Sequence, residues 1–465
     1  MSTVRTPLKW LDERLGTASV ARATFRKVFP DHWSFLLGEI SLFSLVVLVV
    51  SGVFLTFFYT PDSRPTVYDG PFDPLRGQEV SAAFDSVMRL SFSVRAGLLM
   101  RQLHHWAALV FIASIVVHLC RVFFTGAYRR PRELNYALGM GLLLLGLAEG
   151  FTGYSLPDDL LSGIGLRIAY SVSLSIPVIG TWLTYLVFGG EFPTHDIISR
   201  LFVFHVMLLP AILLVGVAVH IVILVLQKHT QFAGPGRTER NVVGKRLWPE
   251  QTFKSVALFL IIAGVLAGLG GLAQINPIWE YGPYNPFSVT APAQPDWYIG
   301  WLDGALRLAP PWDLTLFGYS IPELFWPAVL MPSVVLGLIT FWPWIEPLFT
   351  RDRAEHHLLQ RPRDMPFRTA TGVAGLVLFF VMFLEGGNDV IAVLLDVPVE
   401  TITRLLQVGF VVAPAIAWVI TYRVARNLQV GEEHPGLPLA GERLRRTPRG
   451  GYETEPLEPV ERSSR

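Results

Sequence analysis

Eight long apolar segments constrain the fold of this chain more than any other feature of its sequence. A helix needs roughly 20 mostly apolar residues to cross the hydrocarbon core of a bilayer. We therefore predict an all-α integral membrane protein with eight transmembrane helices. A further apolar stretch at 176–188 is interrupted by Pro177 and Gly180, so we expect a short surface helix there. The eight segments lie at about 36–59, 99–124, 136–155, 198–227, 253–274, 322–346, 369–386 and 402–424.

The composition agrees with this class and excludes several others. Only 16% of the residues are charged and the mean hydropathy is +0.44, whereas soluble chains carry roughly 25% charged residues. A net charge of +1, without a basic patch interleaved with aromatic residues, sets nucleic-acid binding aside. The single cysteine, Cys120, excludes an internal disulfide, a cysteine-held iron–sulfur cluster and covalent haem attachment. We interpret it as a small buried apolar residue.

The loop charges orient the spans. Basic residues follow spans two, four, six and eight and also fill the N-terminal segment, whereas the alternate loops are richer in acid. The positive-inside rule then places both termini in the cytoplasm. The basic loop residues are Arg129, Arg130, Arg132, Lys228, Arg237, Arg240, Lys245, Arg246, Arg351, Arg353, Arg361, Arg363, Arg368, Arg423 and Arg426.

Four histidines lie inside apolar spans, where an ionisable side chain is costly and usually has a partner. His104 and His118 are 14 residues apart on span two, and His205 and His220 are 15 apart on span four. At about 100° and 1.5 Å per residue, each pair shares a helix face and is separated by about 21–22 Å. Both spans run in the same direction, so the histidines face each other at two depths.

This pattern predicts two non-covalent haem b sites, each between two histidines, which suits electron transfer. A single intramembrane histidine more often bonds to a neighbouring helix, but four at matched depths favour haem. His105 adjoins His104 and points about 100° away from it. We therefore expect His105 to have a packing or interfacial role.

Small and basic residues on the neighbouring helices support the haem interpretation. Gly38 and Gly52 on span one, and Gly139 and Gly153 on span three, repeat the 14-residue period. They would let flat macrocycles pass between helices, although small residues also serve ordinary helix packing. About one turn from the span-two histidines, two arginines could each bind a haem propionate; the second also fits a positive-inside anchor. They are Arg101 and Arg121.

Longer motifs around these residues resemble the cytochrome b family over roughly residues 30–425. The resemblance rests on Arg101-Gln-Leu-His-His-Trp106 with His118-Leu-Cys-Arg121, Gly153-Tyr-Ser-Leu-Pro157, Ile176-Pro-Val-Ile-Gly180 and Pro295-Asp-Trp-Tyr298. The last stands where the family usually has Pro-Glu-Trp-Tyr. Residues 31–39 are similar to actinobacterial members.

The resemblance implies the dihaem subunit of a quinol:cytochrome c reductase. His104 and His205 would hold the haem near the outer face, and His118 and His220 the haem near the inner face. Quinol would be oxidised outside, giving one electron to a Rieske-type iron–sulfur protein and the other, through both haems, to quinone inside, with proton translocation. The other implied partners are a cytochrome c subunit, a second copy in a homodimer, a terminal oxidase and membrane lipid.

Quinol oxidation releases two protons and needs a positioned base, for which Asp296 is the candidate. Tyr298 could hydrogen-bond a quinol oxygen, and Tyr154 could line the same pocket. Asp296 alone would be interpreted as a solvated loop carboxylate. It is one methylene shorter than the usual glutamate, so we expect its proton path to need a water or a shifted loop. At the inner site the family's usual histidine is replaced by Val225, with Lys228 and His229 as substitutes.

The chain is thus divided into four predicted parts. Residues 1–35 form an amphipathic cytoplasmic segment, with a charged tail as the alternative. Residues 36–250 form the haem-binding four-helix bundle, and 251–426 form four C-terminal helices with the quinol-site loop. Residues 427–465 form a solvated cytoplasmic tail. Two rival functions keep part of the pattern: the dihaem membrane anchor of another dehydrogenase, and a transporter with a histidine proton relay.

Overall fold

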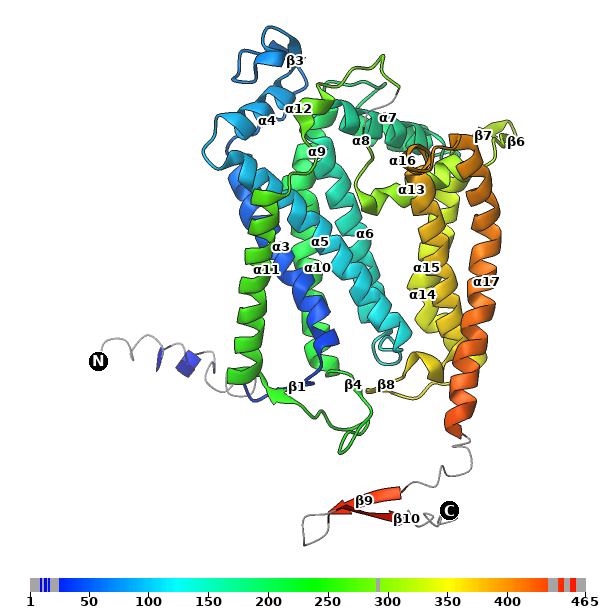
Figure 1. Ribbon diagram of the computed structural model, residues 1–465. Coiled ribbons are helices and arrows are strands. Elements are labelled where there is room, and N and C mark those ends of the chain that lie inside the picture. The colour runs from blue at the N-terminus through cyan, green and yellow to red at the C-terminus, as the bar shows by residue number, and fades with distance from the viewer. Residues whose placement is uncertain are drawn as a thin grey trace.

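The computed structural model describes residues 9–10, 12–14, 16, 25–289, 293–433, 442–446 and 452–456. Within these residues, eight helices are long and apolar enough to span a membrane, which confirms the predicted fold class (Figure 1). Each overlaps one predicted segment. Most of the predicted N-terminal segment and of the C-terminal tail lies outside the described residues. The spans are Trp33–Thr56, Gly97–Phe124, Glu133–Ser155, Ile197–Gln227, Leu247–Leu272, Trp326–Thr350, Pro366–Gly386 and Val399–Gln429.

Four of the eight spans combine regular α-helix with a short turn of 3-10 or π-helix. Helices satisfy every backbone polar group internally, as the bilayer core requires. The helices of the spans are α3 (Leu37–Thr56), α5 (Gly97–Phe124), α6 (Glu133–Ser155), α9 (Ile197–Val203), α10 (Leu209–Gln227), α11 (Thr252–Leu272), α14 (Met331–Thr350), α15 (Pro366–Gly386) and α17 (Val399–Glu433). The irregular turns are η1 (Trp33–Leu36), η3 (Phe204–Leu208), η4 (Leu247–Gln251) and η5 (Trp326–Leu330).

The fourth span contains a π-helical turn between α9 and α10. Pro210, at the start of α10, has no N–H to donate to the preceding turn. The backbone widens into η3 just before it, and such wide turns often occur at functional sites. His205 lies in this turn.

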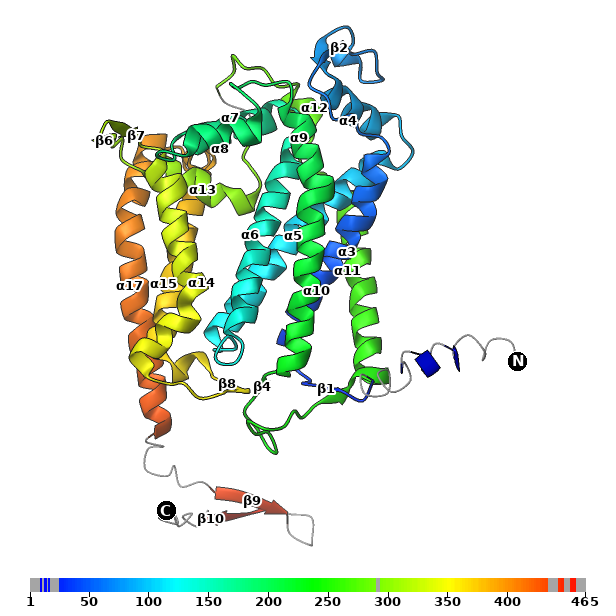
Figure 2. The same cartoon turned by 180° about the vertical axis from the view of Figure 1, so that it is seen from behind.

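The helices form two adjoining groups. In one, α3, α5, α6 and α10 pack as a bundle, and α11 packs against α3 and α5 around Ala107, Ile262 and Leu266. In the other, α15 packs against α17, with α14 beside them and in contact with α6 (Figures 1 and 2). The division predicted between residues 250 and 251 stays a prediction, and in space α11 packs with the spans that precede it.

Short helices gather at one end of the spans, called here the α7 end (Figure 1). The sequence predicts one surface helix at 176–188. The structure has two helices in this connection, because α7 (Leu160–Leu174) precedes α8 (Gly180–Phe188). α7 begins at Asp159, whose side chain and that of Ser162 form a capping box. The short helices at this end are α4 (Ala82–Phe92), α7 (Leu160–Leu174), α8 (Gly180–Phe188), α12 (Ile278–Tyr281), α13 (Trp297–Leu308) and α16 (Asn388–Leu395), with the turn η2 (Asp73–Leu75). The turn η6 (Pro362–Asp364) directly precedes α15 at the opposite end.

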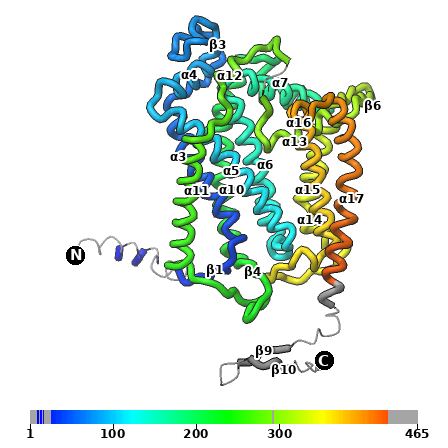
Figure 3. The backbone as a smooth tube through the Cα atoms, viewed as in Figure 1, coloured from blue at the N-terminus to red at the C-terminus, as the bar shows by residue number. Residues whose placement is uncertain are grey.

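The opposite end, called the β4 end, carries the long connection between α10 and α11 (Figure 3). The first described span begins there and the last ends there (Figure 1). Small two-stranded sheets join distant loops: β1 pairs with β5 and β4 with β8 at this end. The sheets are β1 (Val28–Phe29) with β5 (Lys245–Arg246), β4 (Gln231–Phe232) with β8 (Leu358–Leu359), β2 (Pro65–Val67) with β3 (Glu79–Ser81), β6 (Leu314–Leu316) with β7 (Tyr319–Ile321), and β9 (Glu442–Arg446) with β10 (Tyr452–Pro456).

A buried ion pair joins the two helix groups at the β4 end. Arg368 is fully buried, and its Nη1 lies 3.3 Å from Oε1 of Glu346, which is 4% exposed. Tyr128 donates to Oε2 of Glu346 at 2.8 Å, and Trp342 donates to the Tyr128 hydroxyl at 2.8 Å. Gln360 accepts a 2.8 Å bond from Arg368. The cluster therefore links the α5–α6 loop to α14 and α15.

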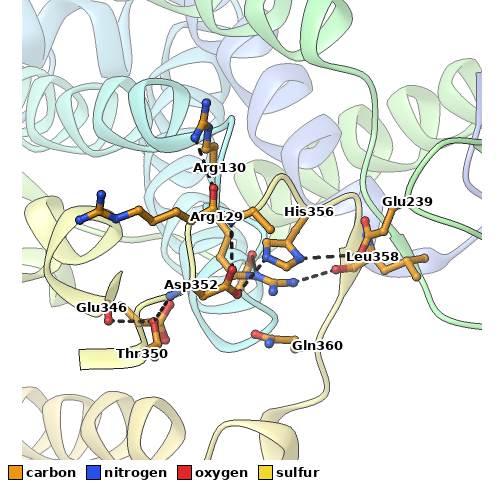
Figure 4. Close-up of polar contacts among 12 residues, drawn as sticks. Arg129, Arg130, Glu239, Glu346, Thr350, Asp352, His356, Leu358 and Gln360 are labelled. Carbon is orange, nitrogen blue, oxygen red and sulfur yellow. Dashed lines mark hydrogen bonds and ion pairs between the residues drawn. The ribbon is translucent and has the colours of Figure 1, made fainter. Parts of the chain in front are cut away.

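The surrounding loops extend this polar contact toward the surface (Figure 4). His356 Nε2 lies 2.9 Å from Asp352, and its Nδ1 lies 3.7 Å from Glu239 in the α10–α11 connection. Arg129 donates to the Leu358 carbonyl at 2.8 Å. Three loops that are far apart in the sequence are thus held together beside Glu346.

Removing the charge of Arg368 should destabilise the chain strongly. We expect Arg368→Met, which keeps the stem of the side chain, to lower the free energy of unfolding by about 3–5 kcal/mol, because Glu346 is left as an unpaired buried charge. The measurement is the thermal unfolding midpoint of the detergent-purified protein. Arg353→Met, at an exposed position, is the matched control. The double variant Arg368→Met/Glu346→Gln should recover much of the loss; equal midpoints for Arg368→Met and the control would refute the assignment.

Candidate functional site

The four intramembrane histidines meet in two pairs between α5 and the fourth span. The ring centroids of His104 and His205 are 6.1 Å apart, with ring planes at 76°. A metal bound at about 2.0–2.1 Å by one nitrogen of each opposing imidazole, as zinc is, would put the centroids roughly 6 Å apart. His118 and His220 lie close enough to interact electrostatically. The spacing of this first pair therefore fits two histidines that would hold one metal centre between them.

Hydrogen bonds orient the rings at the α7 end. His104 Nδ1 lies 2.9 Å from the Ser51 hydroxyl, which itself donates to the Val47 carbonyl at 2.7 Å. The hydroxyl is thus an acceptor for Nδ1–H, and Nε2 is the nitrogen available to a metal. His205 Nδ1 lies 3.1 Å from the Glu149 carbonyl and 3.3 Å from its carboxylate. Sequence reasoning missed Ser51 and Glu149, because neither belongs to a motif.

Each predicted glycine faces one of the four histidines. A β-carbon added at Gly38 would lie 3.4 Å from Cε1 of His118, and one at Gly139 would lie 3.5 Å from Cε1 of His220. At the α7 end, a β-carbon at Gly52 would lie 3.2 Å from Cε1 of His104, and one at Gly153 would collide with His205. The 14-residue period of these glycines therefore reflects direct contact with the imidazole rings.

Two guanidinium groups each keep buried N–H groups without an acceptor among the described residues. Arg101 donates from Nη1 and Nη2 to the Asn276 carbonyl at 3.2 Å, but its Nε has no acceptor. Arg121 lies 4.3 Å over the Phe35 ring, and its Nε and Nη2 have no acceptor. Buried N–H groups are normally paired. An anionic ligand near each histidine pair, such as a haem propionate, fits both positions.

The predicted quinol-site residues come together at the α7 end. Asp296 precedes α13, and Tyr298 in its first turn is 3% exposed. Tyr154, near the end of α6, is close enough to both to interact electrostatically. Burial, together with the neighbouring Asp296 carboxylate, raises the pKa of the Tyr298 phenol well above its usual range. A carboxylate and two phenols thus surround one region beside the helices that carry His104 and His205.

His105 was expected to have a packing or interfacial role, but the structure places it against the Asp296 carboxylate. Its Nε2 lies 2.9 Å from both carboxylate oxygens of Asp296. Sequence reasoning missed this contact because the partners are 191 residues apart. The sequence hinted at a role for His105 only through its position next to His104, which is predicted to bind haem.

At the β4 end, only one of the two predicted inner-site residues is enclosed. The His229 ring packs 4.3 Å from the Phe29 ring. Burial, with the Arg132 charge nearby, lowers the pKa of His229 to about 4. Lys228 is exposed. Cys120, expected to be buried, is only partly so.

Comparison with known proteins gives a consistent match. The family model described as "Cytochrome b(N-terminal)/b6/petB" matches residues 109–283. The chain is 50% identical over 419 residues to the cytochrome bc1 complex cytochrome b subunit of Corynebacterium diphtheriae, which covers 90% of this chain and 77% of the relative. It is 48% identical over 458 residues to the subunit of the same name from Mycobacterium tuberculosis, covering 97% of this chain and 83% of the relative.

A solved structure shares the fold. A chain of the "Hyperthermophilic respiratory Complex III" superposes with a TM-score of 0.63 at 20% identity. The match covers 90% of this chain and all of that chain. This likeness supports the arrangement of the helices.

Gly153→Ala should disturb the histidine pair at the α7 end. The new methyl group would collide with His205. We therefore expect the variant to bind one haem per chain instead of the expected two. Gly141→Ala on the same helix is the matched control, because a β-carbon there meets nothing within 4 Å. Both changes raise helix propensity by about 0.8–1.0 kcal/mol, so this effect cancels. A pyridine haemochrome assay makes the measurement, and equal haem content in both variants would refute the contact.

Proposed function

The chain belongs to the family of cytochrome b subunits of the actinobacterial cytochrome bc1 complex, and on this premise we propose how its residues serve that complex. It is a multi-pass membrane protein that binds haem b and forms part of the respiratory quinol:cytochrome c oxidoreductase. Membership in this family disfavours the dehydrogenase anchor and the proton-relay transporter considered from the sequence.

Two haems b are held without covalent bonds, each between two histidines. His104 and His205 bind the haem at the α7 end, and His118 and His220 bind the other. The observation that carries this assignment is the contact of each histidine with a glycine of a neighbouring helix. The two haems, when bound, supply one-electron transfer between the two ends of the bundle. Arg101 and Arg121 offer their unpaired N–H groups to the propionates.

Quinol is oxidised at the α7 end. The Asp296 carboxylate accepts a proton from a quinol hydroxyl, as a positioned base. Tyr298 stays protonated, since its pKa is raised, and donates a hydrogen bond to a quinol oxygen. Tyr154 lines the pocket from α6. The gathering of these three side chains beside α5 supports the assignment.

Quinone is reduced at the β4 end, where His229 is the central polar residue. Its lowered pKa keeps the imidazole neutral at pH 7, so that it both donates and accepts hydrogen bonds. Lys228, exposed next to it, offers a positive charge at the mouth of this region. The enclosure of His229 beside Phe29 supports its role over that of Lys228.

The orientation and the partners follow from the basic loops and the family. The β4 end, where those loops lie, faces the cytoplasm of a bacterial cell, and both termini lie on that side. The chain works in a homodimeric complex with a Rieske-type iron–sulfur protein and a cytochrome c subunit, beside a terminal oxidase and in contact with membrane lipid.

The haem assignment is tested by counting haems. We expect two b-type haems per chain, and one in His205→Ala, because His104 alone would not hold the haem at the α7 end. Quinol oxidation should fall by at least about 10²-fold in this variant, comparable to the loss of a catalytic group. The measurements are a pyridine haemochrome count and quinol:cytochrome c reductase activity. His195→Ala, exposed at the same end, is the control; two haems retained in His205→Ala would refute the ligand set.

A further inference from the structure

Asp296 occupies the N-cap position of α13 but does not cap it with its side chain. Its backbone carbonyl accepts from the N–H groups of Ile299 at 2.9 Å and Gly300 at 3.1 Å, so the helix begins directly after it. Aspartate is among the preferred N-cap residues, because its side-chain oxygen accepts a backbone N–H of the first turn. In this chain no such side-chain bond is formed. The carboxylate therefore leaves the N–H groups at the start of α13 without a side-chain cap.

The carboxylate is instead directed at α5. His105 Nε2 lies 2.9 Å from Oδ1 and 2.9 Å from Oδ2, so one ring nitrogen faces both oxygens. Both side chains are 16% exposed, which leaves little access to bulk water at this contact. A charged or N–H donor placed between the two oxygens holds the plane and direction of the carboxylate.

We infer that His105 is a positioning residue for quinol oxidation, which keeps the Asp296 carboxylate turned into the quinol pocket and away from the N-terminus of α13. This inference rests on the proposed role of Asp296. Without His105, the competing donors are the Tyr298 hydroxyl, which already lies beside the carboxylate, and the backbone N–H groups of the first turn of α13. A carboxylate turned onto these donors would no longer face α5, and a base must lie within hydrogen-bond reach of the proton that it accepts.

The need for His105 follows from the aspartate itself. Glutamate is not among the preferred N-cap residues. A glutamate at position 296 would therefore have little tendency to fold back onto α13, and its additional methylene would extend the carboxylate into the pocket. The two residues act together: the shorter acid requires a partner on α5 that the longer acid does not.

His105 also fixes where the base lies relative to the haem ligand. It follows His104 directly on α5, so the turn that orients one ligand also orients the residue that holds Asp296. Tyr298 packs against Gly150 of α6, where an added β-carbon would lie 2.8 Å from the hydroxyl. The base and the phenol are thus anchored on two helices of the bundle, α5 and α6.

The test is a double-mutant cycle in the purified complex, which reports whether two residues act through one another. The variants are His105→Leu, Asp296→Asn and both together. The readout is the rate of b-haem reduction by a short-chain quinol, with the haem spectrum recorded for each variant. We expect His105→Leu to slow the reduction by about tenfold, which is less than the roughly 10²-fold or more that the base itself contributes. The double variant should be no slower than Asp296→Asn alone.

A rescue experiment separates positioning from a structural role. Asp296→Glu in the His105→Leu background should restore the rate to within about threefold of the native complex, since glutamate does not compete for the cap. His105→Gln, which keeps an N–H donor of similar reach, should retain most of the rate. His195→Leu, at an exposed position of the same end, should have the native rate.

The outcomes distinguish this inference from the proposed function. A native rate in Asp296→Asn would overturn the assignment of Asp296 as the base. A slow Asp296→Asn with a native His105→Leu would overturn the role of His105 alone, as would multiplicative losses in the double variant or no rescue by glutamate. If His105→Leu loses a haem band, the same cycle is run with His105→Asn, whose shorter amide does not reach Asp296, and its result decides.

Discussion

The contact between small residues and imidazole rings is the interaction on which the rest of this structure depends. Gly38, Gly52, Gly139 and Gly153 remove side-chain volume where the four histidines project from α5 and the fourth span. Helices in a membrane gain little from apolar burial and associate largely through close packing and polar contacts. The bundle is thus arranged around the rings, and each of these glycines leaves room for one ring from a neighbouring helix.

The two ends of the bundle solve different electrostatic problems. At the β4 end, the buried Arg368–Glu346 pair is surrounded by donors and acceptors that satisfy most of its polar atoms, which a buried pair requires. This network joins two helix groups, and both oxygens of its Glu346 carboxylate accept hydrogen bonds. At the α7 end, the Asp296 carboxylate faces the His105 ring nitrogen and lies close to the Tyr298 and Tyr154 phenols. The first arrangement suits stability, and the second suits the transfer of a proton.

The pairing of Asp296 with His105 offers a way in which an aspartate, where the family usually has glutamate, is accommodated by a residue on another helix. An aspartate before a helix has two competing uses, as a cap and as a base. The backbone of α13 offers the first use locally, and a side chain 191 residues away favours the second. Catalytic residues that would otherwise serve local structure need such a partner when their side chain is short.

The sequence by itself determined the class of the fold, the eight spans, the pairing of the histidines by depth and the glycines that face them. These features depend on local helical geometry, since a rise of about 1.5 Å and a turn of about 100° per residue convert spacing into depth and face. The motifs also singled out Asp296, Tyr298 and Tyr154, which the structure brings close together.

Only the tertiary structure decided the contacts between distant segments. The π-turn that carries His205, the extra helix α7, the bonds of Ser51 and Glu149 to the ligand rings and the His105–Asp296 pair all depend on how the helices meet. Helical periodicity places a side chain on a face of its own helix, but it does not identify the element opposite. The angle and register between helices arise from the packing of all of them together.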